Sequence, residues 1–549
     1  MIRHGLLLLG AALLTAAAPP PPRPKLIVAI SVDQFASDLF VRYRNRLTGG
    51  IRRLSRGIVF ANGYQSHAAT ETCPGHSTIL TGMHPAATGI IANRWYDRTT
   101  KAQVYCVAVP GSADPDARGP QNLRVATLGD WLKAASPASR VVAVSGKDRA
   151  AITMAGHHAD AVYWWVDGKG FLTMATAGPA DDSVTAPAAA FDRALFDGWR
   201  SELPQLWPTK LPADCPALVR PHKFGALDLS GEVPPADSTI PSGTDPTKAE
   251  FQARLRASPA FDPLTLQFAA RLVDQRRLGR GAATDLLAIS LSSTDYVGHR
   301  YGNGGAEMCA HLHALDQALG TFFARLDAQK IRYAVVLTAD HGAVDAAERA
   351  SEAGLPARRI DGSGLVKALN QHLMSALNLA AEPITGDDPQ QLYITVGDDP
   401  ALRDKVRAET LAWLKTRKDV AASFTAAEIV AAAPPRGKPV DRLSLAERFH
   451  ESYDPARSGN IAVALAEYAT VGMPKKPGDT VAGHGSPWNY DRRVPILFWW
   501  RGIAPRDRTE AIETVDIAPT LARLIGIAAP PVDGHCLAQV TKSCPAARR

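Results

Sequence analysis

The stretch LIVAISVD, residues 26–33, is a short apolar run that ends in an aspartate. Two later runs have the same form: residues 286–291 lead to Asp295, and residues 333–338 lead to Asp340. Short apolar runs separated by helical segments are typical of strands in a mainly parallel sheet with helices on both faces. We therefore predict an α/β fold. Because the carboxyl ends of neighbouring parallel strands meet at one crevice, the aspartates are expected to lie together there.

The rest of the chain extends this pattern and interrupts it twice. Three further core strands are expected, at residues 57–64, 140–145 and 494–500. Irregular, proline-containing stretches at roughly 178–263 and 344–459 break the rhythm of strands and helices. We interpret both as cap segments inserted into one catalytic domain that covers residues 19–549.

Composition narrows the class of protein. The 549 residues are 46% hydrophobic and 21% charged, as in an ordinary soluble globular protein, and are enough for a large core plus insertions. The net charge of +7 would help to attract an anionic substrate. No basic run interleaved with aromatic residues indicates a nucleic-acid surface, so we expect no nucleic-acid polymer as a partner. The oligomeric state cannot be read from the sequence.

The N-terminus resembles an export signal. Arg3 and His4 precede the apolar stretch 5–14, and small residues follow up to Ala18. This pattern is typical of a secretory signal peptide, here residues 1–18, and predicts a periplasmic or secreted protein. The apolar stretch is too short to span a bilayer comfortably, so no membrane anchor is expected, although an uncleaved anchor is the alternative.

The cysteines fit the same picture. There are six, an even number that permits disulfides in an oxidising compartment, and they lack zinc-ribbon spacing. Cys536 and Cys544 are close in sequence and could pair to staple the C-terminal segment. The connectivity cannot be read from the sequence.

A hydroxyl stands at the expected start of a helix in the segment TETCPGHST, residues 70–78. Pro74 is well tolerated in a first helical turn, and Thr72 is a plausible N-cap just before it. The positive end of the helix dipole would stabilise an ionised Thr72 oxygen, and so would a bound metal. The alternative is that Thr72 only caps the helix.

Three polar residues that follow Thr72 in the sequence could contact a phosphate group. Asn93 comes first, and Lys147 and Arg149 directly follow the strand expected at 140–145. An arginine fork and a lysine point charge at a strand end suit the outer oxygens of a phosphate. The alternative for Lys147 and Arg149 is a solvated surface turn.

Histidines accompany the aspartates at the strand ends. His299 comes four residues after Asp295, His341 directly follows Asp340, and His484 lies between two glycines that allow close backbone approach. Zinc accepts mixed histidine and carboxylate ligands, whereas calcium and magnesium favour all-oxygen sets. We therefore predict zinc or another transition metal. Two such ions about 4 Å apart can clamp the attacking and leaving oxygens of an in-line displacement.

Together these motifs resemble the alkaline phosphatase superfamily, in its type I phosphodiesterase/nucleotide pyrophosphatase branch. They most resemble the bacterial alkaline phosphatases that use a threonine nucleophile. The matching pieces run in the family's order over most of the chain: Val32-Asp33, Thr72-Cys73-Pro74-Gly75-His76, Asn93, Lys147-Asp148-Arg149, Asp295-Tyr296-Val297-Gly298-His299, Ala339-Asp340-His341-Gly342 and Gly483-His484-Gly485.

The resemblance implies two zinc ions per chain. One would be held by Asp295, His299 and His484. The other would be held by Asp33, Asp340, His341 and the oxygen of Thr72. Thr72 would attack phosphorus and form a phosphothreonine. The non-bridging phosphate oxygens would be held by Asn93, Lys147 and Arg149.

The lysine–arginine pair determines the expected substrate. A monoester presents a doubly charged group with three free oxygens, so added cations favour it. Diesterases and nucleotide pyrophosphatases of this branch typically lack the pair. The resemblance therefore implies a metal-dependent alkaline phosphatase that acts on small phosphate monoesters. The alternatives are a phosphodiesterase or nucleotide pyrophosphatase, and an exported zinc- or phosphate-binding protein without turnover.

Overall fold

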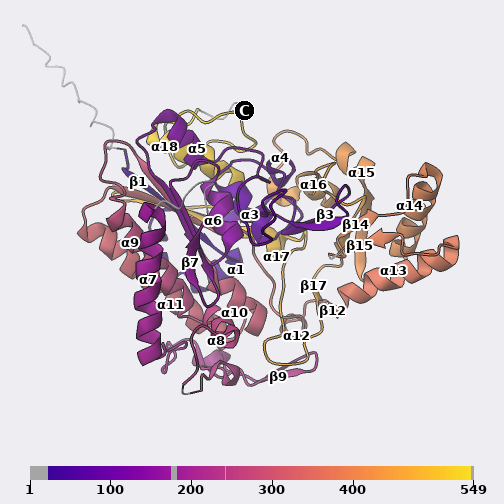
Figure 1. Ribbon diagram of the computed structural model, residues 1–549, viewed down its shortest axis with the longest axis horizontal. Helices are drawn as coiled ribbons and strands as arrows, with labels where there is room; N and C mark the ends of the chain where they lie inside the picture. The colour runs from indigo at the N-terminus through magenta and orange to yellow at the C-terminus, as the bar shows by residue number, and fades with distance from the viewer. Residues whose placement is uncertain (1–22, 175–181, 242, 387, 546–549) are drawn as a thin grey trace, which may run out of the picture.

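The computed structural model describes residues 23–174, 182–241, 243–386 and 388–545. The predicted signal peptide, residues 1–18, lies outside them. A ten-stranded sheet forms the centre of the molecule, with the order β19-β2-β18-β11-β1-β10-β5-β6-β7 and with β20 beside β2 (Figure 1). Its strands are β1 (Leu26–Val32), β2 (Ile58–Tyr64), β5 (Val141–Ser145), β6 (Ala161–Val166), β7 (Gly170–Thr173), β10 (Asp285–Leu291), β11 (Tyr333–Thr338), β18 (Arg493–Trp500), β19 (Arg506–Arg508) and β20 (Ile512–Glu513).

The central strands run parallel, as predicted. β1 pairs in parallel with β10 and β11, and β5 pairs in parallel with β10 and β6. β18, the strand expected at 494–500, is antiparallel to both of its neighbours, β11 and β2. The parallel block therefore places the carboxyl ends of β1, β5, β10 and β11 at one edge of the sheet.

Strand β1 shows how the sheet divides the core. Val28 and Ile30 belong to one apolar cluster, whereas Ile27 and Ala29 belong to another on the opposite face. Burial on both faces explains why the strand reads as a continuous apolar run. One face is covered by α1 (Ser37–Tyr43), α2 (Gly50–Leu54), α9 (Phe261–Gln275) and α11 (Ala306–Ala328). The other is covered by α3 (Thr72–Ile79), α5 (Leu128–Ala135), α6 (Asp148–Ala155) and α18 (Ile517–Ile525).

The first insertion packs against the edge of this sheet. It contains α7 (Asp182–Ser201), β8 (His222–Phe224), β9 (Leu227–Leu229) and α8 (Ala249–Arg256), with 3-10 turns at Pro216–Leu218 and Ala236–Ser238. Trp165 of β6 contacts the rings of Phe196 and Trp199 from α7, with centroids 6.1 and 6.3 Å apart. Burying a large apolar side chain contributes roughly 1.5–3 kcal/mol, so this aromatic cluster fixes α7 to the sheet.

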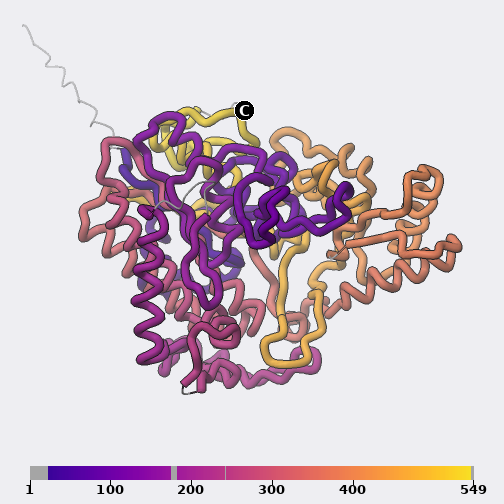
Figure 2. The backbone as a smooth tube through the Cα atoms, viewed as in Figure 1, coloured from indigo at the N-terminus to yellow at the C-terminus, as the bar shows by residue number. Residues whose placement is uncertain are grey.

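The second insertion forms a small layer of its own. In Figures 1 and 2 it is the orange part beside the main sheet. Its four-stranded sheet has the order β13-β14-β16-β15 and includes β16, which follows the expected end at residue 459. These strands are β13 (Ile384–Thr385), β14 (Gln391–Ile394), β15 (Val420–Thr425) and β16 (Ile461–Leu465). A separate apolar cluster joins them to α13 (Gly362–Leu377) and α14 (Pro400–Lys415).

Short elements complete this region and connect it to the core. They are α12 (Ala347–Glu352), β12 (Arg358–Ile360), α15 (Ala426–Ala431), α16 (Leu445–His450), β17 (Ala469–Val471) and α17 (Asn489–Arg492), with 3-10 turns at Val440–Arg442 and Thr514–Asp516. The core reaches toward the insertion through α4 (Pro85–Thr88) and a hairpin of β3 (Arg94–Asp97) and β4 (Ala102–Tyr105). The rings of Tyr96 on β3 and Tyr393 on β14 lie 5.5 Å apart, so the hairpin contacts the inserted sheet.

All six cysteines form disulfides. Cys536 pairs with Cys544, as predicted, and the remaining pairs are Cys73–Cys106 and Cys215–Cys309. The second of these ties the first insertion to α11. Across the described residues, no helix combines the length and apolar character needed to cross a bilayer.

Candidate active site

The acidic and histidine residues predicted for the site converge at the carboxyl edge of the parallel strands. Asp33 directly follows β1, and Asp340 and His341 follow β11. Asp295 and His299 lie on α10 (Ser293–Tyr301), which begins just after β10. His484 comes from the loop before α17. The sheet thus brings together side chains that are up to about 450 residues apart in sequence.

Asp33, Asp340 and His341 form one compact group. The Nε2 atom of His341 lies 3.4 Å from Oδ1 of Asp33 and 3.3 Å from Oδ2 of Asp340. All three side chains are fully buried. This is a three-residue set whose ligand atoms are close enough to share one cation.

Asp295 is the centre of a second group. Its Oδ1 atom lies 3.1 Å from Nε2 of His299 and 3.3 Å from Nε2 of His484. His484 also stacks on His341, with ring centroids 3.6 Å apart, and Asp295, His341 and His484 form another possible ligand set. The two groups are therefore contiguous.

The outer nitrogen of each histidine in the second group is held by the backbone. Nδ1 of His299 hydrogen-bonds the Ala482 carbonyl at 2.8 Å, and Nδ1 of His484 hydrogen-bonds the Thr70 carbonyl at 2.8 Å. Because a carbonyl only accepts, Nδ1 must carry the proton and Nε2 of the neutral ring is left as an acceptor facing the site. Histidine ligands of metals are commonly oriented in this way.

The donor atoms of this site fit a divalent metal. Among the described residues, Oδ1 of Asp33, Oδ1 of Asp295 and Nε2 of His341 are buried without a hydrogen-bond partner. Leaving so many buried polar atoms unsatisfied is costly unless another group binds them. Mixed carboxylate and imidazole ligands suit zinc or a similar transition metal.

Lys147 lies between the two groups. Its Nζ atom is 2.5 Å from Oδ2 of Asp33 and 2.6 Å from Oδ2 of Asp295, and only 4% of the residue is exposed. Burial alone would lower the pKa of Lys147, but the carboxylates of Asp295 and Asp33 raise it well above its usual value. The surface-turn alternative for Lys147 is therefore wrong.

The pKa values of Asp33 and Asp295 are shifted in opposite directions. Burial raises the pKa of Asp33, and the neighbouring charge of Asp340 raises it further. Burial would also raise the pKa of Asp295, but His299 and Lys147 hold it well below its usual range. The ionised carboxylate of Asp295 is thus the more strongly favoured of the two.

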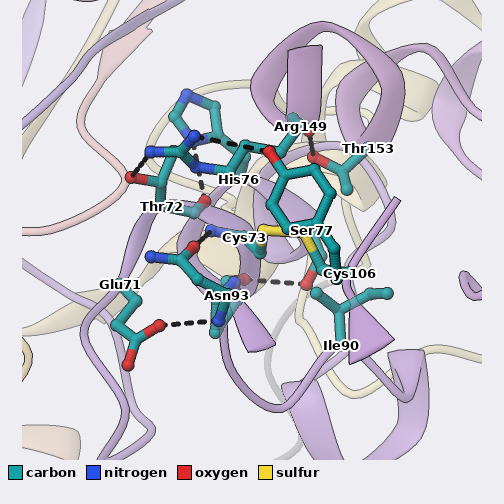
Figure 3. The surroundings of a disulfide bond; sticks show 12 residues. Glu71, Thr72, Cys73, His76, Ser77, Ile90, Asn93, Cys106, Arg149 and Thr153 are labelled. Carbon is teal, nitrogen blue, oxygen red and sulfur yellow. Dashed lines mark hydrogen bonds between the residues drawn. A yellow bond between two sulfur atoms is a disulfide. The ribbon is translucent and has the colours of Figure 1, made fainter. Parts of the chain in front are cut away.

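Thr72 is the first residue of α3 and not its N-cap. The N-cap is Glu71, and no side chain makes a capping hydrogen bond. The Thr72 hydroxyl is instead 3.4 Å from Nη2 of Arg149, as Figure 3 shows. The expectation that Thr72 caps the helix is therefore wrong by one residue, because its side chain faces the site instead of folding back onto the helix backbone.

Helix α3 is held tightly against the end of β11. Nδ1 of His76 lies 3.1 Å from Oδ2 of Asp340 and 2.9 Å from the Thr72 carbonyl. A Cβ atom on Gly75 would lie 2.0 Å from the Asp340 carbonyl oxygen, so only glycine allows this approach. The start of α3, and with it Thr72, is fixed relative to the carboxylates.

Asn93 is locked to the same helix. Its Oδ1 atom accepts a hydrogen bond from the Cys73 amide at 2.9 Å, and its own backbone amide donates to Oε2 of Glu71 at 2.6 Å (Figure 3). The Cys73–Cys106 disulfide joins this helix start to the end of β4. Asn93 and Thr72 are thus parts of one rigid unit.

Comparison with known proteins identifies the family. The family model for type I phosphodiesterase/nucleotide pyrophosphatase matches residues 27–487. The chain belongs to this family.

Relatives of this family support the assignment over nearly the whole chain. Alkaline phosphatase PhoK of Sphingomonas sp. is 42% identical over 530 residues, which cover 94% of this chain and 91% of PhoK. Alkaline phosphatase PhoD of Zymomonas mobilis is 40% identical over 525 residues, covering 93% and 88% of the two chains. The crystal structure of alkaline phosphatase PafA superposes with a TM-score of 0.80 at 27% identity and covers 95% of this chain and 99% of PafA. The predicted family and fold are confirmed, and so is the prediction that the chain is an enzyme.

One residue at this family site was not anticipated from the sequence. The hydroxyl of Tyr105, at the end of β4, lies 3.4 Å from Nη1 of Arg149 and donates to Oδ1 of Asp148 at 2.6 Å. Nε of Arg118 binds the other oxygen of Asp148 at 3.0 Å. Tyr105 therefore fixes the guanidinium that reaches Thr72. Only the pairing of its neighbour Cys106 with Cys73 could have pointed to it, and that pairing was open.

Proposed function

We propose that this member of the family is an alkaline phosphatase that hydrolyses small phosphate monoesters through a phosphothreonine at Thr72. The observation that carries the proposal is the contact between Arg149 and the Thr72 hydroxyl beside a buried carboxylate–imidazole cluster. A guanidinium at this distance from the nucleophile would meet the oxygens of a phosphoryl group attached to Thr72. Small esters are proposed as substrates in preference to nucleic-acid polymers.

The proposed reaction has two displacements at phosphorus. In the first, Oγ of Thr72 attacks phosphorus, the bond to the ester oxygen breaks, and the alcohol leaves after taking up a proton. In the second, water attacks the same phosphorus, the bond to Oγ breaks, and inorganic phosphate is released with Thr72 restored. Covalent catalysis of this kind divides one difficult step into two easier ones.

The side chains around Thr72 take complementary roles in this proposal. Arg149 would bind two non-bridging oxygens through its fork, and Lys147 would add a point charge. The side-chain Nδ2 of Asn93, whose Oδ1 accepts from the Cys73 amide, would donate to a further oxygen. Pre-oriented donors of this kind stabilise charge in the transition state without reorganisation.

The proposed metal centre contains two zinc ions. We assign one to Asp295, His299 and His484, and the other to Asp33, Asp340, His341 and the Thr72 oxygen. When bound, such ions lower the pKa of a coordinated hydroxyl and neutralise charge on a departing oxygen. The unsatisfied buried atoms of the aspartates and of His341 support the assignment.

The cations favour a monoester over a diester. A monoester carries two negative charges, whereas a diester carries one and has a second ester group in place of a free oxygen. Arg149 and Lys147 thus gain more from the monoester. A phosphodiesterase or nucleotide pyrophosphatase is the second candidate function, because the matching family model is named for these activities.

Matched substrates test the choice. We expect purified protein to hydrolyse nitrophenyl phosphate with a kcat/KM well above that for its methyl diester. Arg149→Ala should reduce kcat/KM for the monoester by about 10²–10³-fold, as loss of a charge-stabilising donor typically does, and reduce the diester rate much less. Arg149→Lys, which keeps the charge but loses the fork, should lie between. Equal losses on both substrates would contradict the monoester assignment.

We also propose that the protein acts in the periplasm or outside the cell. Three disulfides join all six cysteines, and such bonds persist in oxidising compartments.

A further inference from the structure

A hollow opens beside the nucleophile, between the β3–β4 hairpin and the start of β14. Its volume is about 190 Å³, and its walls come from the core and from the second insertion. Six of its lining residues bear on what it can bind: Glu71, Asn93, Tyr96, Gln103, Asp388 and Tyr393. The indigo hairpin and the orange β14 lie next to each other in Figure 1, and the Tyr96–Tyr393 ring contact joins them.

The hollow borders the proposed phosphoryl site, because Asn93 belongs to both. Glu71 directly precedes Thr72, and Asn93 is bound both to the Glu71 carboxylate and to the Cys73 amide. In Figure 3 the Glu71 and Asn93 side chains lie on the side of α3 away from His76, which contacts Asp340. An ester held at Thr72 by Arg149 and Lys147 has one part without an assigned contact, namely its alcohol. Because Asn93 lines the hollow and also belongs to the proposed phosphoryl site, the hollow adjoins that part of the ester.

The size of the hollow limits what it can accept. Cavities of about 150 Å³ accommodate a benzene ring, whereas sites for drug-sized ligands have roughly 300–1,000 Å³. A hollow of about 190 Å³ therefore fits one ring or a short polyol. The half-buried ring of Tyr96 and the buried ring of Tyr393 provide an apolar wall.

The charge of the hollow is opposite to that of the phosphoryl site. Glu71 and Asp388 both line it, and among the described residues no lysine, arginine or histidine nitrogen lies within 4.0 Å of either carboxylate. The Glu71 carboxylate accepts a hydrogen bond from the Asn93 amide at 2.6 Å, and the Asp388 carboxylate accepts one from the Gln390 amide at 2.9 Å, so both groups act as acceptors beside the hollow. The cation at the rim, Arg94, is engaged with the ring of Tyr105 at 5.0 Å.

We propose that this hollow is the subsite for the leaving alcohol, and that it selects neutral or cationic alcohols over those that carry a second anion. The inference rests on the proposed function and adds a substrate class to it. Two carboxylates beside the alcohol would repel a carboxylate or a second phosphate and attract an ammonium group. The net charge of +7 of the whole chain would instead attract anionic esters. A preference for cationic esters can therefore be assigned to the hollow and not to the net charge.

Three phenyl phosphates that differ only in their para substituent test this subsite. The substituents are aminomethyl, hydroxymethyl and carboxymethyl, which give cationic, neutral and anionic leaving groups of similar size. At mildly alkaline pH we expect kcat/KM to fall in that order, by roughly 10-fold between the extremes, as expected for partly screened charges.

Three variants localise the effect. Asp388→Asn keeps the acceptor for the Gln390 amide but removes the charge. It should reduce the difference in kcat/KM between the cationic and the anionic ester to about 3-fold or less. Gln103→Glu, on the exposed side of the hollow, should increase that difference. Glu382→Gln removes an exposed carboxylate of the second insertion that does not line the hollow, and should leave the difference unchanged.

The outcomes separate this inference from the proposed function. No turnover of the neutral ester would contradict the proposed function itself. Equal turnover of all three esters by the wild-type protein, or a faster anionic ester, would overturn only the subsite. A difference that persists in Asp388→Asn and does not widen in Gln103→Glu would also overturn it, because the selecting charge would then lie elsewhere.

Discussion

The two ends of the site are built in different ways. The phosphoryl end, where Thr72 and the proposed metal ligands lie, consists mostly of side chains at strand ends of the main sheet and on helices that follow them, with Asn93 and His484 added from loops. Its carboxylates are almost completely buried. The alcohol end lies between the β3–β4 hairpin and an inserted sheet that has its own apolar core. The first end therefore depends mainly on the fold of the core. The second depends on how an insertion packs against it.

This difference places the reaction chemistry at the phosphoryl end and the choice of substrate at the alcohol end. Strand ends are positioned by a ladder of backbone hydrogen bonds and two layers of apolar packing, so their geometry is fixed by the most stable part of the molecule. Loops and insertions can vary without disturbing that ladder. We infer that the substrate range of this enzyme is set mainly at the alcohol end.

Substitution of Tyr105 is expected to have the largest effect on turnover among the variants discussed next. Tyr105 lies on the hairpin that borders the alcohol end, but its hydroxyl contacts Arg149 at the phosphoryl end. Tyr105→Phe should lower kcat/KM for the monoester by about 10-fold, the effect of a positioning hydrogen bond to a charged group, and lower the diester rate less. The para-substituent preference should not change.

A matched tyrosine controls for loss of a hydroxyl. The Tyr333 hydroxyl binds Asp327 at 3.1 Å near the start of β11, at the opposite edge of the sheet from the site. Tyr333→Phe should leave the ratio of monoester to diester rates unchanged. If Tyr105→Phe lowered both rates equally, Tyr105 would have only a structural role.

His84 allows a smaller perturbation, which acts on the connection between the core and the second insertion. The residue lies just before α4 and forms ion pairs with Glu451 after α16 and with Glu513 of β20, the latter at 2.9 Å. Burial would lower the pKa of His84, but hydrogen bonds to these carboxylates raise it well above its usual value. The charged form therefore stabilises the folded state.

The sign of the pH dependence follows from this shift. The contribution of His84 should be complete below its unfolded pKa of about 6.5 and should disappear as the pH rises through the higher folded value. His84→Gln should lower the free energy of unfolding by about 2 kcal/mol near pH 6, and by progressively less at alkaline pH. Urea unfolding at several pH values measures this.

His372 is the control for His84. It pairs with Glu409 at 2.6 Å on the surface of the second insertion, with about a third of each side chain exposed. Such pairs contribute about 0–1 kcal/mol, so His372→Gln should have little effect. A constant difference between wild-type protein and His84→Gln across the pH range would show that charge is not the source of the stabilisation. Turnover of the neutral ester should stay within about 2-fold in both variants.

The fold could be predicted because buried parallel strands leave a clear signal. Residues 26–32 are apolar throughout, since both faces are covered, and the runs that lead to Asp295 and Asp340 have the same cause. The direction of β18 was not predictable, because an apolar run has the same appearance in either direction. The inserted sheet was also missed, since its short strands alternate with prolines and polar turns.

The residues of the site could likewise be predicted only where a local sequence pattern marks them. Asp33, Asp295 and Asp340 could be grouped because each follows a strand, and the flanking glycines indicated His484. Tyr105 and Asp388 carry no such signal. Their positions depend on a disulfide and on packing between segments nearly 300 residues apart, which no local pattern records.

The most direct test of the account is to look for phosphate on Thr72 during turnover. Protein mixed with excess nitrophenyl phosphate is quenched with acid within milliseconds, and the peptide that contains Thr72 is examined by mass spectrometry. We predict a phosphorylated Thr72 in the wild-type protein, and neither phosphopeptide nor turnover in Thr72→Ala. Normal turnover by Thr72→Ala, or phosphate on another residue, would contradict the account.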